Sequence, residues 1–201
     1  MRWWFIFLLA TSSFAADFDE NTRWDLSTKL GFTLGRVTKE GSTTLAEATY
    51  DFSGIPLAIA LNHDLSKFVS LSEEIQLMMD FLNRSISRIG LSESVLINLF
   101  GGARRLVSNY GNIVVIRKTG FNVSLLIKGG LHIYGASTKT SNVRLDGIVF
   151  ESAAGFSSRF DLSATSSLGV ELSRTLLSLA ASSTRLKGSF YEASLFFRYY
   201  L

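Results

Sequence analysis

The chain has 201 residues, of which 47% are hydrophobic and 18% are charged, and its formal net charge is +3. The charges are scattered along the chain and nearly balanced, so the composition does not favour a nucleic-acid-binding surface. The absence of cysteine excludes a disulfide framework, a lipoprotein attachment site and thiolate chemistry.

Residues 1–15 have the pattern of a secretory signal peptide. A positive charge precedes the apolar run Trp3–Ala10, and the small residues Ser13 and Ala15 follow it, as at a signal cleavage site. The apolar run is too short to cross a bilayer, which takes roughly 20 residues. We therefore expect the signal to be removed and residues 16–201 to form the folded domain.

The first long alternating run lies at 24–34. Its even positions are mainly apolar and its odd positions are polar, charged or glycine, which predicts a β-strand with two different faces. A soluble sandwich alternates in the same way, so alternation alone does not decide the class. The runs at 24–34, 121–133 and 160–172 exceed the ~5 to 6 residues of globular strands and suit the ~9 to 11 of a tilted membrane strand. The sequence therefore favours an all-β chain that forms a single transmembrane antiparallel up-and-down β-barrel.

The next two segments are less regular. A strand is expected at 54–61, where the only proline, Pro56, stands near the beginning and its missing amide is tolerated. Residues 65–86 fit either a helical apolar stripe or a strand that carries Glu73 outward or in a bulge. We favour the strand, because a helix would leave the neighbouring strands without hydrogen-bonding partners.

The region from 89 to 120 sets the number of strands. Glu93 interrupts the apolar face of a strand expected at 89–103. We interpret the short apolar stretch Ile113–Ile116 as part of a long turn between the fourth and fifth strands, because an even strand number is needed if both termini lie on one side. Ten strands is the alternative, if a further strand balances this stretch.

The register of the strand expected at 143–154 is ambiguous, because the apolar residues of 143–156 fall on both faces. One face holds Val143, Leu145 and Val149, and the other holds Ile148, Phe150 and Phe156. A β-bulge near Gly147 would explain the switch.

The last strand carries the most informative pattern. Every second position is apolar or aromatic: Tyr191, Ala193, Leu195, Phe197, Tyr199 and Leu201. This spacing resembles the C-terminal assembly strand of bacterial outer-membrane barrels, which usually ends in Phe or Trp where this chain has Leu201. The whole chain thus resembles the small barrels of the OmpA, OmpX and OmpW kind. The resemblance implies export to the bacterial outer membrane, with membrane lipid, lipopolysaccharide and the barrel-insertion machinery as partners.

The count of strands is eight under this interpretation. They are expected at 23–37, 54–61, 68–80, 89–103, 121–135, 143–154, 158–172 and 189–201. The outer loops are then 38–53, 81–88, 136–142 and 173–188, and tight inner turns are expected at Asn62–Lys67 and Gly155–Ser157.

Charged residues on inward positions predict a plug in the lumen of the barrel. They are Asp25, Lys29, Asp161, Glu192 and Arg198. If Asp25 stands opposite Arg198, then Asp161 reaches Arg198 from the other side. In the same register Lys29 faces Ser194, one inward step from Glu192. Because unpaired ions in a narrow interior are costly, we expect a cluster of the first three and a Lys29–Glu192 pair above it; the alternative is that water solvates all five.

Other candidate chemistry is sparse. His63 lies in an expected turn and His132 faces the expected lumen, but no spacing marks a nucleophile beside either, so we expect no enzyme activity. No cluster at metal-ligand spacing is present, and no cofactor is expected. Arg104 and Arg105 follow two glycines and could contact an anion or partner, although a charged collar at the membrane interface is the simpler interpretation.

These observations favour a barrel whose lumen is largely filled by its own side chains and which has a structural or surface-contact role in the envelope. A narrow pore for small or apolar solutes is the alternative, as the resemblance to OmpW-type barrels implies. An outer-membrane lipid-modifying enzyme is a more remote alternative.

Overall fold

The computed structural model describes ten strands and the residues that adjoin them. The described ranges are 24–39, 48–65, 68–80, 86–101, 106–110, 113–117, 120–136, 147–163, 166–180 and 186–200. The strands are β1 (Trp24–Lys39), β2 (Ala48–Asp64), β3 (Val69–Asp80), β4 (Ile86–Phe100), β5 (Leu106–Tyr110), β6 (Ile113–Arg117), β7 (Phe121–Ala136), β8 (Gly147–Asp161), β9 (Ser166–Ala180) and β10 (Leu186–Tyr200). The expected signal peptide at 1–15 lies outside the described residues.

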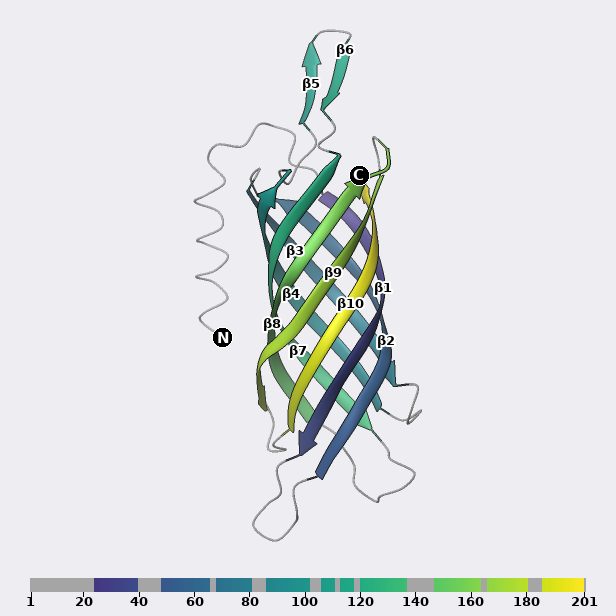
Figure 1. Ribbon diagram of the computed structural model, residues 1–201, viewed down its shortest axis with the longest axis vertical. Helices are drawn as coiled ribbons and strands as arrows, with labels where there is room; N and C mark the ends of the chain where they lie inside the picture. Colours follow the sequence, from purple (N-terminus) through teal and green to yellow (C-terminus); the bar gives the residue numbers. More distant parts are fainter. Residues whose placement is uncertain are drawn as a thin grey trace.

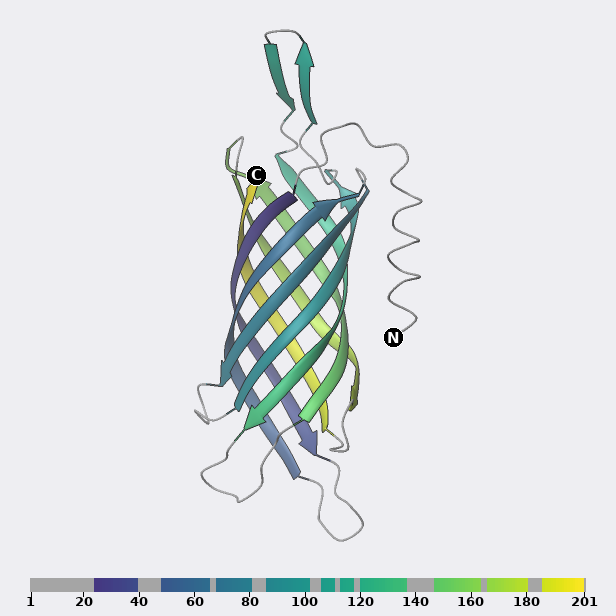
Figure 2. The ribbon, with the colours of Figure 1, turned by 180° about the vertical axis from the view of Figure 1, so that it is seen from behind.

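Eight of these strands close into an antiparallel barrel. The order around the barrel is β1-β10-β9-β8-β7-β4-β3-β2, so each strand pairs with its neighbours in the chain except where β4 pairs directly with β7. β1 pairs with β10 and closes the sheet (Figures 1 and 2). The predictions of an all-β chain and of an eight-stranded up-and-down barrel are confirmed. Within the described residues, no helix is long and apolar enough to cross a membrane.

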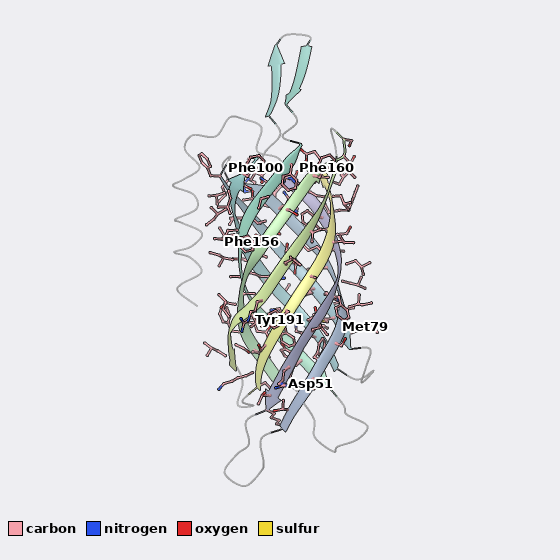
Figure 3. All side chains as sticks on the ribbon, in the orientation of Figure 1. Asp51, Met79, Phe100, Phe156, Phe160 and Tyr191 are labelled. Atoms are coloured by element: carbon pink, nitrogen blue, oxygen red, sulfur yellow. The ribbon has the colours of Figure 1, made fainter. Side chains whose placement is uncertain are left out.

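Alternation places two different surfaces on the barrel. The even residues of β1 face outward, and Leu30 is 54% exposed, whereas the inward Asp25 is only 3% exposed. The outward side chains project away from the ribbon around the whole barrel (Figure 3). An apolar exterior around a polar interior is the arrangement of a transmembrane barrel and the reverse of a soluble one.

Residues 65–86 contain the strand β3 rather than a helix. Leu71, Ile75, Leu77 and Met79 share the outward face, and Glu73 lies on that face within a continuous register to both neighbouring strands. The helical stripe is therefore incidental, because the hydrogen bonds that β3 makes to β2 and β4 are needed to close the barrel.

The boundary between β8 and β9 differs from the prediction. The expected turn at Gly155–Ser157 lies inside β8, and the chain turns after Asp161, where the amides of Leu162 and Ser163 donate to the carbonyl oxygen of Ser166 at 3.0 and 3.1 Å. The pattern hides this turn because even positions face outward on both of its sides.

The expected bulge near Gly147 is also wrong. Gly147 pairs regularly with Tyr134, and the even positions of β8 stay outward along the strand. The irregularity lies instead between Ser152 and Ala153 in the pairing with β9. The buried Val149 is apolar because it belongs to the interior, which explains why apolar residues occupy both faces.

The strands extend further toward the outer loops than expected, notably in β2, β9 and β10. They continue past the apolar band because their inward faces still pack together, as Phe52 and Phe190 do. On β1 and β2 the outward side chains of this part are polar. Arg36 and Asp51, for example, form an exposed ion pair at 3.0 Å on this part of β1 and β2.

The long turn between β4 and β7 contains a two-stranded ribbon, β5-β6, that forms its own sheet. Gly101 and Gly120 stand at the two ends of this turn, next to β4 and β7. Their φ angles of +87° and +46° lie in a region that favours glycine. Figure 1 shows the ribbon beyond the end of the barrel where β10 finishes. Ile113–Ile116 is thus part of a strand, but the ten strands do not form one ten-stranded barrel.

Candidate functional site: the lumen

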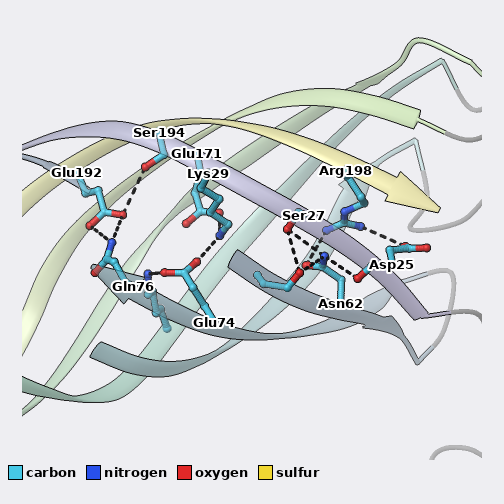
Figure 4. A network of polar contacts seen from close by, with 12 residues as sticks. Asp25, Ser27, Lys29, Asn62, Glu74, Gln76, Glu171, Glu192, Ser194 and Arg198 are labelled. Carbon is cyan, nitrogen blue, oxygen red and sulfur yellow. Dashed lines mark hydrogen bonds and ion pairs between the residues drawn. The ribbon is translucent and has the colours of Figure 1, made fainter. Parts of the chain in front are cut away.

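The inward side chains of the described strands form four groups in the interior of the barrel. From the chain termini toward the outer loops, we name them the base cluster, the central cluster, the upper cluster and the apolar cap. Each is built from inward positions of several strands, so residues far apart in the sequence meet in the lumen. Figure 4 shows the base cluster with parts of the central and upper clusters.

The base cluster contains Asp25, Ser27, Asn62 and Arg198, all buried. Arg198 Nη2 donates to Asn62 Oδ1 at 3.2 Å, and Arg198 Nη1 lies 3.9 Å from Asp25 Oδ2. Asn62 Nδ2 in turn donates to Ser27 Oγ at 3.1 Å. One buried guanidinium therefore meets a carboxylate and an amide that is itself held by β1.

The central cluster contains two lysines and two glutamates. Lys29 Nζ lies 2.7 Å from Glu74 Oε2 and 2.8 Å from Glu171 Oε2. Lys128 Nζ donates to the other oxygen of Glu74. The Glu74 side chain is 0% exposed, and the two positive charges balance the two negative charges. A buried ion pair is tolerated when every charge has a partner of this kind.

The upper cluster is organised around Arg88. Its Nη1 donates to Glu151 Oε2 at 3.2 Å and its Nη2 to Gln76 Oε1 at 2.6 Å. Gln76 Nε2 donates to Glu192 at 3.0 Å, and the Tyr134 hydroxyl donates to Glu151. The amide of Gln76 therefore links a cation on one side to a carboxylate on the other.

The apolar cap closes the end of the lumen nearest the outer loops. It consists of Val37, Phe52, Met78, Tyr134, Val149, Leu186 and Phe190. Phe190 packs edge-on against Phe52, with ring centroids 5.6 Å apart, and stacks on Tyr134 at 6.3 Å. The guanidinium of Arg88 lies 5.0 Å from the centre of the Phe190 ring, so the cap rests directly on the upper cluster.

Two small cavities adjoin these groups within the described part of the lumen. A cavity of about 20 Å³ adjoins Arg88, His132 and Phe190, and another of about 10 Å³ adjoins Lys29 and Phe196. A single water needs about 10 to 15 Å³ of such a cavity, so each of these two cavities has room for about one water.

The five predicted lumen residues all lie on inward positions, and the predicted Asp25–Arg198 ion pair is present, but the register and the partners of Lys29 differ from the expected ones. In the β1–β10 register Arg198 stands opposite Ser27 and not Asp25. This two-residue shift places Glu192 opposite Thr33, so the predicted Lys29–Glu192 pair is wrong. Lys29 instead contacts Glu74 and Glu171, and Asp161 lies 3.8 Å from Arg159 of its own strand.

Other predicted residues can be placed as follows. Tyr191, Leu195, Phe197 and Tyr199 are exposed on the outward face of β10, whereas Leu201, Arg104 and Arg105 lie outside the described residues. His132 is buried in the lumen, 3.8 Å from Glu151. His63 belongs to β2 and not to a turn, and its ring stacks on Trp24 at 4.5 Å.

Sequence reasoning missed most of the charged lumen residues. Glu74, Arg88, Glu151 and Glu171 complete the central and upper clusters, and each occupies an inward parity within its strand. Parity could have identified them. Most of their ion-pair partners, however, come from the strand next but one around the barrel, and the pairing of adjacent strands does not specify such contacts.

The comparisons with solved structures identify the same architecture. Neisserial surface protein A has 9% sequence identity over 88% of this chain and 97% of its own, with a TM-score of 0.53. The N-terminal β-barrel domain of Pseudomonas aeruginosa OprF has 9% identity over 90% of this chain and 100% of its own, with a TM-score of 0.50. The chain has the fold of the small bacterial outer-membrane β-barrels. No protein-family model and no curated protein matches the sequence.

Proposed function

We propose that this chain is an integral outer-membrane barrel with a closed lumen, and that its role in the envelope is structural or depends on surface contact. The observation that supports the proposal is the series of buried inward side chains that follow one another along the lumen, from the base cluster to the apolar cap. At eight strands the interior of a barrel is just wide enough for side chains to fill it.

The exterior supports the membrane location. Along β1 the outward face is mainly apolar from Trp24 to Leu34, and at ~3.3 Å per residue with a tilt of ~40° this spans roughly the 25 Å apolar band of such barrels. Trp24 and Tyr199 at one edge and Tyr191 near the other fit interfacial positions. Outer-membrane lipid and lipopolysaccharide are the partners of this surface, and the insertion machinery acts on β10 during assembly.

Solute flux into proteoliposomes tests the closed lumen. Vesicles that contain the refolded protein should swell no faster in small sugars or amino acids than empty vesicles, with an open porin as the positive control. Swelling rates that fall with solute size would instead establish the narrow-pore alternative.

A further inference from the structure

Two glutamates interrupt the apolar exterior of the barrel at one place. Glu73 of β3 and Glu93 of β4 are exposed on the outward face. They stand directly opposite each other in the β3–β4 register. Like charges on opposed positions of neighbouring strands repel each other, so the pair does not stabilise the barrel by itself.

The depth of this pair makes it unusual. On the outward face of β3, Glu73 is followed toward the loops by Ile75, Leu77 and Met79. Toward the chain termini it is followed by Leu71 and Val69. Glu93 is flanked in the same way, with Leu91 and Ile89 on one side and Val95 and Ile97 on the other. Each carboxylate therefore occupies the middle of the apolar face of its strand, far from either interface.

The surface beside the pair is recessed. Glu93 is opposite Gly129 of β7, and Gly129 is opposite Ser152 of β8. A side chain built on Gly129 would find only the Phe150 ring within 4 Å, at 3.7 Å, so its outward side is open. Small residues next to a polar group in a membrane surface allow another segment to approach closely.

A carboxylate that faces hydrocarbon is costly unless a cation or hydrogen-bond donor meets it. The described strands of a second copy place no outward-facing cation at this depth. Among the described residues, the outward-facing cations Arg36 and Lys187 lie near the loop ends of β1 and β10. Arg174 lies within β9, where it stands opposite Tyr191 near the outer edge of the apolar face and its guanidinium packs on the Tyr191 ring at 5.1 Å. Two copies inserted in the same direction would keep those cations away from the pair.

We propose that the outward face of β3, β4 and β7 around Glu73, Glu93 and Gly129 docks a membrane-embedded segment of another protein that carries a lysine or arginine at mid-bilayer depth. The two carboxylates hold the cation, and the recess at Gly129 admits its side chain. This inference rests on the membrane location proposed above.

The probe is a synthetic polyleucine transmembrane helix with one central lysine, compared with the same helix carrying leucine at that position. The barrel contains no cysteine, so Thr49→Cys at the loop end of β2 gives a single dye site for energy transfer in lipid vesicles. The unsubstituted face should bind the lysine helix at least tenfold more tightly than the leucine helix. Glu73→Gln/Glu93→Gln, which preserves size, should abolish that preference.

The control is Ile75→Ala/Leu91→Ala, which alters the adjacent apolar surface and should keep the preference for lysine. Equal binding of the two helices by the unsubstituted face, or a preference that survives in the double glutamine variant, would overturn the inference. Dimers in peptide-free vesicles that disappear in the glutamine variant would also overturn it, because the occupant would then be a second copy. Heat-modifiable gel migration checks insertion first, and a barrel that never inserts would contradict the proposed function itself.

Discussion

Glu73 and Glu74 are adjacent in sequence and lie in opposite surroundings. Glu73 is exposed on the outside of β3, whereas Glu74 is buried between Lys29 and Lys128. The side-chain period of a strand is two, so one step along the chain moves a carboxylate from the lipid-facing surface to the interior. The pair therefore offers a matched comparison of a buried and an exposed charge within one strand.

Glu74→Gln should destabilise the barrel, because it leaves Lys128 and half of the contacts of Lys29 without an anion. Removing one partner of a buried ion pair typically costs about 3 to 5 kcal/mol. Equilibrium unfolding by urea in lipid vesicles measures the change. Glu73→Gln is the control, and it should leave the free energy of unfolding unchanged or raise it. A similar loss in both variants would contradict the assigned facing.

At the scale of the strand, the outward or inward facing of side chains could be predicted from the sequence, and the positions of strand ends could not. The parity of 24–34 and of Tyr191–Tyr199 follows from alternation alone, because the pleat places alternate residues on opposite faces. The turn after Asp161 was hidden, since a tight turn can preserve parity on both sides. The observed β1–β10 register differs from the predicted one by two residues. A shift of two residues preserves facing, so Lys29 is buried as predicted but has other partners than predicted.

The facing of β10 leads to a depth-dependent prediction. Leu195 pairs with Leu30 near the middle of the apolar face of β1, whereas Tyr199 pairs with Leu26 near its end. Leu195→Arg should cost about 2 to 4 kcal/mol at mid-bilayer depth, and Tyr199→Arg about 0 to 1 kcal/mol near the interface. Unfolding in vesicles of one lipid composition gives both values. Equal costs would mean that β10 does not cross the bilayer at the assigned depth.

The ribbon β5-β6 should be dispensable for closure of the barrel. It forms a separate sheet, and β4 pairs with β7 without it. Replacing residues 102–119 with a short glycine- and asparagine-containing turn should preserve the β-sheet circular dichroism spectrum and heat-modifiable migration. Loss of both in the shortened chain, while the full chain refolds under the same conditions, would show that the ribbon is needed for assembly.

At the scale of the molecule, an eight-stranded barrel could be predicted from long alternating runs and an even strand number. The side-chain clusters inside the barrel could be predicted only in outline. Its central and upper clusters join β1, β3, β4, β7, β8, β9 and β10, and contacts across a closed barrel depend on its diameter and tilt rather than on any one pairing. The apolar cap was likewise hidden, because Phe190 and Val149 resemble lipid-facing residues in the sequence and in fact face inward.

The central claim is that the lumen is closed, and conductance of the refolded protein in a planar lipid bilayer tests it most directly. Because we propose that the base, central and upper clusters and the apolar cap close the lumen, we expect the folded protein to insert and to show no steady current steps in a KCl electrolyte. Gel migration of the same sample should verify that folded barrel was added. A steady open channel in the unsubstituted protein would contradict the account.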